Sequence, residues 1–175
     1  MGTLNYKIIN NFLEKDNFLK LQEYLFSKDI LWNHLFYGHN KEIGKPGIGF
    51  YIYEIYKEYQ PVSEIFNKFI LNIMKKLKAI SIIYVRANLI IHKNKEESCD
   101  WHVDNMGSNS KTAVFYMNNC NGYTVLKLNN NEEIKVSSEE NKILIFDKDI
   151  LHKVVGQTNI EKRIVLNINY YDHDN

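Results

Sequence analysis

The chain has 175 residues, of which 45% are hydrophobic and 25% charged, and its formal net charge is +1. This composition is typical of one globular domain that buries roughly two-thirds of the surface its unfolded chain exposes, and it excludes an intrinsically disordered chain. The near-neutral charge argues against a broad phosphate-binding face, two cysteines exclude a disulfide framework, and no apolar run approaches the roughly 20 residues of a membrane span. We therefore expect a cytoplasmic protein without a membrane partner.

The first third of the chain predicts two helices separated by a strand. Asp16 is expected to cap the first helix, whose apolar residues recur with a helical period over 18–26. A second apolar stripe over 65–77, with lysines largely off it, predicts the second helix. Between them, residues 50–56 are rich in β-formers and predict a strand.

From about residue 80 the pattern changes to short β-rich runs separated by polar turns. The runs are 82–92, 112–118, 122–128, 132–136, 142–147, 151–155 and 163–171. Many short strands without intervening helices are typical of a sandwich, jelly roll or small barrel. The sequence thus predicts one α+β domain over 1–175, with helical support over about 1–80 and a β-core of about eight strands over about 80–171.

Two short motifs in the β-rich part carry candidate metal ligands. His102 and Asp104 are two residues apart, so in a strand their side chains point to the same face and can converge on one ion. His152 stands 48 residues after Asp104, just beyond another predicted strand. Two histidines and one carboxylate leave open coordination positions, an arrangement that suits non-haem Fe(II) and oxygen chemistry.

The two arginines of the chain, Arg86 and Arg163, are candidates for specific roles. The other 20 basic residues are lysines, which supply simple positive charge. Only a guanidinium can bind a carboxylate through two parallel hydrogen bonds. Arg163 lies eleven residues after His152 and opens the last predicted strand, where Asn167 shares its face. Arg86 likewise shares a strand face with Asn88.

Three other interpretations of these residues stay open at this point. The polar residues of a β-protein can align by accident, and a cupin-like module can keep the metal ligands after losing catalysis. A zinc hydrolase also uses two histidines and a carboxylate, although it has no need of an arginine eleven residues after the second histidine.

The order of His-x-Asp, His and Arg resembles the Fe(II)/2-oxoglutarate-dependent dioxygenases, in particular their prolyl-4-hydroxylase-like branch. The resemblance covers about 80–171, and within it the sequence is similar to phage-encoded members of the family. Four stretches carry it: Arg-Ala-Asn-Leu at 86–89, His-Val-Asp-Asn at 102–105, Asn-Gly-Tyr-Thr-Val at 121–125, and Arg followed by Asn-Ile-Asn-Tyr-Tyr within 163–171.

The resemblance implies a fold and a set of residue roles. The fold would be a double-stranded β-helix, a jelly-roll or cupin-like core with supporting helices outside. His102, Asp104 and His152 would hold Fe(II). Arg163 would pair with the far carboxylate of the cosubstrate 2-oxoglutarate, which the hydroxyl group of Tyr116 would also contact.

Further pocket residues follow from the same resemblance. Asn167 would assist Arg163, and Arg86 and Asn88 would line the cosubstrate or substrate pocket. Many relatives have a tyrosine where this chain has Ile90, so one contact to 2-oxoglutarate is missing here.

The implied activity is oxidative decarboxylation of 2-oxoglutarate to succinate, coupled to hydroxylation of a substrate C–H bond with O2 and supported by ascorbate. A protein or peptide side chain is the favoured substrate, and a small molecule is an alternative. A nucleic-acid base is less favoured because of the low net charge, although a lysine cluster at 75, 76, 78, 93 and 95 around the pocket mouth would reverse this. A phage-encoded member would act in the host cytoplasm.

Overall fold

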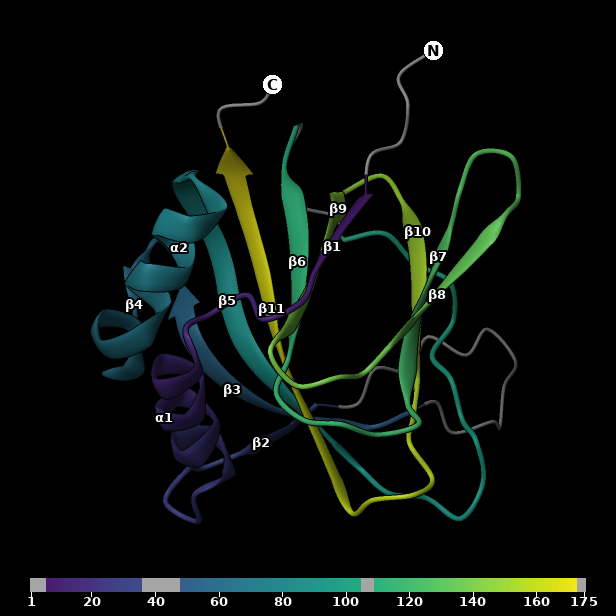
Figure 1. Cartoon of the computed structure of the whole chain (residues 1–175), viewed down its shortest axis with the longest axis horizontal. Helices are drawn as coiled ribbons and strands as arrows, with labels where there is room; N and C mark the ends of the chain where they lie inside the picture. The colour runs from purple at the N-terminus through teal and green to yellow at the C-terminus, as the bar shows by residue number, and fades with distance from the viewer. Residues whose placement is uncertain (1–5, 36–47, 105–108, 173–175) are drawn as a thin grey trace.

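The computed structural model describes residues 6–35, 48–104 and 109–172, and two antiparallel sheets facing each other dominate it (Figure 1). The major sheet has eight strands in the order β1-β9-β6-β11-β5-β3-β2, with β4 paired to β3, and the minor sheet has the order β10-β7-β8. The major-sheet strands are β1 (Tyr6–Ile9), β2 (Asn33–Leu35), β3 (Phe50–Lys57), β4 (Gln60–Pro61), β5 (Ala79–Ile91), β6 (Lys111–Tyr116), β9 (Lys142–Asp147) and β11 (Lys162–Asp172). The minor-sheet strands are β7 (Tyr123–Lys127), β8 (Glu133–Ser137) and β10 (Leu151–Val155). All seven strands expected beyond residue 80 are confirmed.

Two helical segments cover the face of the major sheet that is turned away from the minor sheet (Figure 1). They are α1 (Lys15–Phe26) and a π-helical turn, η1 (Phe66–Ile70), that continues into α2 (Leu71–Leu77). Both expected helices are therefore confirmed. The expected cap is wrong: the N-cap position is Glu14, and Asp16 lies in the first turn, where a carboxylate still interacts favourably with the helix dipole.

Residues before position 80 also contribute strands to the major sheet. β1 pairs antiparallel with β9, so that Tyr6 lies opposite Phe146. The predicted strand at 50–56 is confirmed as β3, which pairs with both β2 and β5. The N-terminal part therefore extends both edges of the sheet as well as supplying the helices.

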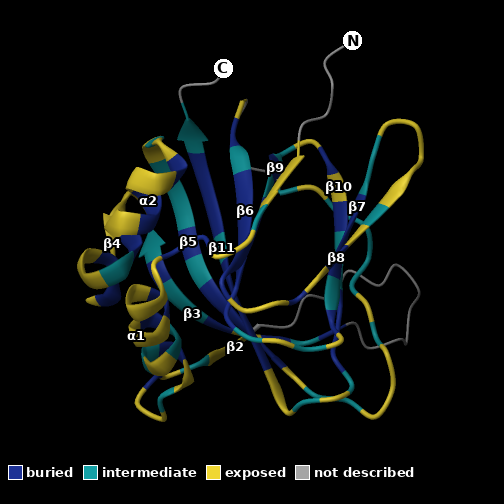
Figure 2. Ribbon diagram, viewed as in Figure 1, coloured by how far each residue is buried: buried dark blue, intermediate teal, exposed yellow. Residues whose placement is uncertain are grey.

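The major sheet separates two hydrophobic cores, and its central strands β6 and β11 are largely buried on both faces (Figure 2). The outer core lies between this sheet and the helices and includes Leu21, Ile73 and Phe115. The inner core lies between the two sheets and includes Leu126 and Leu144. Because alternate residues of a strand face opposite sides, every second residue of β5, β6 and β11 points to the inner face, where the site described below lies.

Among the helices in the described part of the chain, none is long and apolar enough to cross a membrane.

Candidate metal centre

His102, Asp104 and His152 form a compact group of possible metal ligands. His102 lies on an extended segment that pairs with β10 at isolated β-bridges, one of which joins His102 to His152 by backbone hydrogen bonds of 3.0 and 2.9 Å. Their imidazole rings are 4.3 Å apart between centroids. The ligand atoms offered by the three residues all lie within 4.8 Å of one another, which confirms the predicted convergence.

Backbone carbonyl groups orient both imidazoles. His102 Nδ1 lies 2.9 Å from the carbonyl oxygen of Asp100, and His152 Nδ1 lies 3.1 Å from that of Ile150. Because a carbonyl oxygen can only accept a hydrogen bond, each Nδ1 carries the proton. Each Nε2 therefore keeps its lone pair for a metal, which is the usual arrangement around a metal-binding histidine.

Two donors hold the carboxylate of Asp104 from the side away from the histidines. Thr112 Oγ1 and Asn169 Nδ2 each donate to Asp104 Oδ2 over 2.9 Å, and Asn169 also donates to Thr112 Oγ1 over 3.0 Å. The other oxygen, Oδ1, faces His152 Nε2 at 3.9 Å. One carboxylate oxygen is thus occupied by the protein, while the other points toward the two imidazoles.

The protonation states of these groups suit metal binding. Burial alone would raise the pKa of Asp104, but His152 and the hydrogen bonds from Asn169 and Thr112 outweigh it, so the pKa lies below its ordinary value. Burial lowers the pKa of His152, against the opposing charge of Asp104. At neutral pH the group therefore offers a carboxylate and a neutral imidazole.

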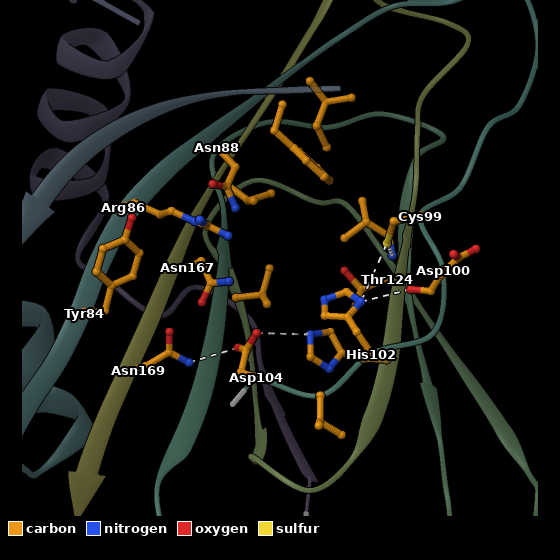
Figure 3. A pocket seen from close by; sticks show the side chains of 17 residues that line it. Tyr84, Arg86, Asn88, Cys99, Asp100, His102, Asp104, Thr124, Asn167 and Asn169 are labelled. Atoms are coloured by element: carbon orange, nitrogen blue, oxygen red, sulfur yellow. Dashed lines mark hydrogen bonds and ion pairs between the residues drawn. The ribbon is translucent and has the colours of Figure 1, made fainter. Parts of the chain in front are cut away.

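The three ligands face a cavity of about 310 Å³ between the two sheets, shown in Figure 3. The wall opposite the histidines is the inner face of β5 and β11. Its polar members are Tyr84, Arg86, Asn88, Asn167 and Asn169. Apolar and small side chains complete the lining, among them Phe50, Ile90, Cys99, Val114, Thr124, Val154 and Val165.

Three of the predicted pocket residues lie in this wall. Arg86 and Asn167 are directly opposite each other in the β5–β11 register, and Asn88 is opposite Val165. Figure 3 shows these polar side chains reaching into the cavity across from His102. Asn88 Oδ1 and Asn167 Oδ1 are buried and have no hydrogen-bond partner among the residues that the structure describes, so the wall presents unused polar groups to a ligand.

Arg163 and Tyr116 lie beyond the lining of the cavity. Both side chains are fully buried, and the guanidinium carbon of Arg163 is 5.7 Å from the centroid of the Tyr116 ring. Tyr116 donates its hydroxyl proton to Thr124, which does line the cavity, and burial raises the pKa of Tyr116 to about 12. Val165, which lies opposite Tyr116 in the sheet, forms the adjacent part of the lining.

The guanidinium of Arg163 is a buried cation without an ion-pair partner among the described residues. Its Nη1 donates to the carbonyl oxygen of Val155 over 2.9 Å, and its Nε has no hydrogen-bond partner. Burial lowers its pKa, yet an arginine side chain stays charged at neutral pH. A buried charge is expensive unless it is paired, so this position favours the binding of an anion next to Arg163.

Thr112 and Asn169 were not predicted from the sequence as residues of this site. Strand alternation could have found both, because Asn169 shares a face with Asn167 and Thr112 shares a face with Tyr116. What no local pattern shows is their contact with Asp104, which depends on how β6 and β11 pack beside the ligand-bearing segment.

Several solved structures share this fold, and three of them illustrate the similarity. A Pseudomonas putida prolyl-4-hydroxylase aligns with a TM-score of 0.72 and 15% identity, covering 98% of this chain and 94% of that one. A Trichoplax adhaerens prolyl hydroxylase in complex with a hypoxia inducible factor peptide aligns with a TM-score of 0.68 and 17% identity, covering 95% and 83%. Streptomyces hygroscopicus HygX with nickel and 2-oxoglutarate bound gives a TM-score of 0.63 and 9% identity, covering 98% and 84%.

These similarities confirm the expected double-stranded β-helix, the fold that this chain shares with prolyl hydroxylases and other 2-oxoglutarate-Fe(II) oxygenases. Comparison with protein-family models gives no match, and neither does comparison with curated protein sequences. At 9 to 17% identity these structures establish the fold alone.

Proposed function

We propose that the protein is an Fe(II)- and 2-oxoglutarate-dependent oxygenase that hydroxylates a side chain of a protein or peptide. One observation carries the proposal: His102, Asp104 and His152 converge in the cavity with their other polar atoms already bonded to the protein. Only the atoms that a metal needs remain available. Two histidines and one carboxylate on one side of an ion are the donor set of non-haem Fe(II) oxygenases.

The charges around the cavity fit an iron ion with an anionic cosubstrate. His102, Asp104 and His152 would hold Fe(II), and the neutral imidazoles keep the net charge of the site low enough to accept a dianion. When bound, Fe(II) would supply the oxidative decarboxylation of 2-oxoglutarate to succinate and CO2, coupled to hydroxylation of the substrate with O2 as the oxidant. Ascorbate would keep the iron reduced.

The protein's own residues would anchor and orient the cosubstrate. The far carboxylate of 2-oxoglutarate would supply the counter-ion that Arg163 lacks among the described residues. The hydroxyl group of Tyr116 would assist after releasing its bond to Thr124. Asn167 and Asn88, whose side-chain amides have unused hydrogen-bonding capacity, would orient the cosubstrate along the β5–β11 wall.

Three observations support a side chain as substrate. The cavity of about 310 Å³ is at the lower end of the range for ligand pockets, so a bound cosubstrate leaves little room beside it. Arg86 reaches into this space from the wall (Figure 3) and would position a carbonyl group of the substrate. Prolyl hydroxylases are among the solved structures that share the fold.

The lysines named above as a possible nucleic-acid surface do not gather at the cavity mouth. Lys76 belongs to α2, on the opposite side of the major sheet. Lys93 and Lys95 each pair with Glu97, at 2.5 and 3.7 Å. This arrangement keeps a nucleic-acid base as the less favoured substrate.

Succinate formation by the purified protein with Fe(II), ascorbate, O2 and 2-oxoglutarate tests the reaction class. We expect succinate from the wild type and none from His102→Ala, which loses an iron ligand. Adding proline-containing peptides should increase turnover and give peptides that are heavier by one oxygen atom. Where turnover needs the true substrate, the anaerobic Fe(II) protein should still show a metal-to-ligand charge-transfer band with 2-oxoglutarate. Absence of both succinate and the band would contradict the proposal and favour a zinc site or a binding module.

A further inference from the structure

We propose that the outer side of the major sheet carries a second binding site, for a small molecule with a phosphate monoester group. A second cavity of about 310 Å³ lies there, separate from the metal centre. The outward-facing sides of β1, β6, β9 and β11 and the C-terminal end of α2 surround it. The residues on which the proposal depends are Lys7, Lys76, Lys78, Lys111, Tyr170 and Asp172.

Four lysines from separate segments converge on this cavity. Lys7 comes from β1, Lys111 from β6 and Lys76 from α2. Lys78 is the C-cap residue of this helix and has a left-handed backbone conformation. The acidic neighbours are fewer. Asp147 pairs with Lys111 at 2.7 Å, and Asp172 is the one carboxylate in the lining. Three ammonium groups thus share one carboxylate among the residues that line the cavity.

Ordinary structural roles explain only part of this cluster. Lysines near the C-terminal end of a helix interact favourably with its dipole, which accounts for Lys76 and Lys78. Lys76 also donates a hydrogen bond to the carbonyl oxygen of Phe12 over 2.7 Å. Lys111 is accounted for by its ion pair with Asp147, whereas Lys7 lies on β1 and serves no helix end. Its charge beside Lys76 and Lys78 in the lining of one cavity adds repulsion between like charges, which a bound anion would relieve.

The charge and the walls of the cavity favour an organic phosphate. A phosphate monoester carries a charge of about −1.5 to −2 at neutral pH, which matches the excess of ammonium groups over carboxylates. Lysine binds phosphate as a point charge. The rest of the lining is apolar or aromatic, with Ile9, Leu77 and Ile145 beside the rings of Tyr6 and Phe12. These side chains would pack against the organic part of the ligand.

Titration of the 15N-labelled, metal-free protein with phenyl phosphate at constant ionic strength tests the site. Without a metal, the phosphate cannot bind through the metal centre. We expect saturable shifts of the backbone amide signals of Lys7, Lys111 and Tyr170. The double variant Lys7→Gln, Lys78→Gln should bind about tenfold more weakly, because it loses two charges. These two lysines are exposed, and neither side chain donates a hydrogen bond to another residue of the described ranges, so the variant should fold normally.

A matched pair of lysines provides the control. Lys15 and Lys20 are exposed on α1, away from the cavity, and Lys15→Gln, Lys20→Gln removes the same charge without changing the site. We expect this variant to bind phenyl phosphate as the wild type does, and inorganic phosphate to bind more weakly than phenyl phosphate. Three outcomes would overturn the proposal: equal weakening in both double variants, shifts confined to the inner face of the sheet, or equal affinity for the two phosphates.

Discussion

Asn169 donates a hydrogen bond of 2.9 Å to the carboxylate of Asp104, which stands 65 positions earlier in the chain. The same carboxylate oxygen accepts a second hydrogen bond from Thr112. These two contacts decide which oxygen of Asp104 turns toward the imidazoles. The candidate metal centre therefore depends on β6 and β11 as much as on the segment that carries its ligands.

Asn169→Leu is expected to weaken metal binding about 10- to 100-fold, because such supporting contacts tune affinity by that amount. The substitution removes the donor while keeping the number and branching of the side-chain heavy atoms. Competition with a chelator for Mn(II), under conditions where the folded fraction is checked by circular dichroism, measures the change. Thr112 supplies a matched pair: Thr112→Ser keeps the hydroxyl donor and should bind nearly as the wild type does, whereas Thr112→Val should resemble Asn169→Leu. Unchanged affinity in both Asn169→Leu and Thr112→Val would show that Asp104 needs no such support.

Arg163→Lys is expected to weaken 2-oxoglutarate binding by about 1–3 kcal/mol, because an ammonium group cannot reproduce the paired hydrogen bonds of a guanidinium. Arg163→Met removes the charge while keeping an unbranched side chain. Since the described residues offer Arg163 no carboxylate, this variant should be about as stable as the wild type without 2-oxoglutarate. Thermal unfolding with and without 2-oxoglutarate distinguishes the two effects. A normal stabilisation of Arg163→Met by 2-oxoglutarate would remove Arg163 from the proposed site.

Gly122→Ala is expected to destabilise the fold by about 1–3 kcal/mol, the usual range for overpacking. A Cβ atom at this position would lie 3.0 Å from the backbone nitrogen of Gln157 and 3.2 Å from Nη1 of Arg163. The backbone contact cannot give way easily, and the guanidinium would be displaced. Gly49→Ala is the control, because its Cβ atom would meet its nearest neighbour, Nε2 of His34, at an ordinary 3.5 Å. Urea unfolding of both variants should give a clearly lower midpoint for Gly122→Ala alone.

Asn141→Ala is expected to destabilise the protein by about 2–4 kcal/mol, because it removes two buried hydrogen bonds and leaves a residue with less tolerance for positive φ. Asn141 bonds both backbone groups of Leu13 at 2.8 Å, and its φ is 58°. Asn141→Asp keeps one acceptor and the tolerance for this conformation, so its loss of stability should be smaller. Equal stability of Asn141→Ala and the wild type in urea unfolding would contradict this account.

The β-rich part of the fold was predictable because each strand there is a local run of β-forming residues bounded by polar turns. The run at 142–147 coincides with β9, and the run at 151–155 coincides with β10. β1 was not predictable, because its four residues become a strand by pairing with β9, more than a hundred positions away. Its first three residues are exposed, so it lacks the alternating pattern of a half-buried strand.

The metal ligands were predictable for the same reason that the strands were. In extended backbone a spacing of two residues places His102 and Asp104 on one face, and His152 needed only a β-context. The place of Arg163 behind the cavity lining was not predictable, because it depends on the packing of Val165 and Thr124 in front of it. The outer cavity was also missed, since its lysines are scattered from position 7 to position 111.

The alternation of side chains along β6 and β11 joins the two sides of the major sheet. Lys111 lies opposite Tyr170 in the strand register and faces the outer cavity, while the next pair, Thr112 and Asn169, faces inward to Asp104. A ligand that shifted these two strands on one side would therefore also move the residues that they contribute to the other side. Such linkage is reciprocal: whatever factor an outer ligand applies to the affinity for metal, the metal applies to the affinity for that ligand. Measuring either affinity in the presence of the other ligand gives the same coupling free energy.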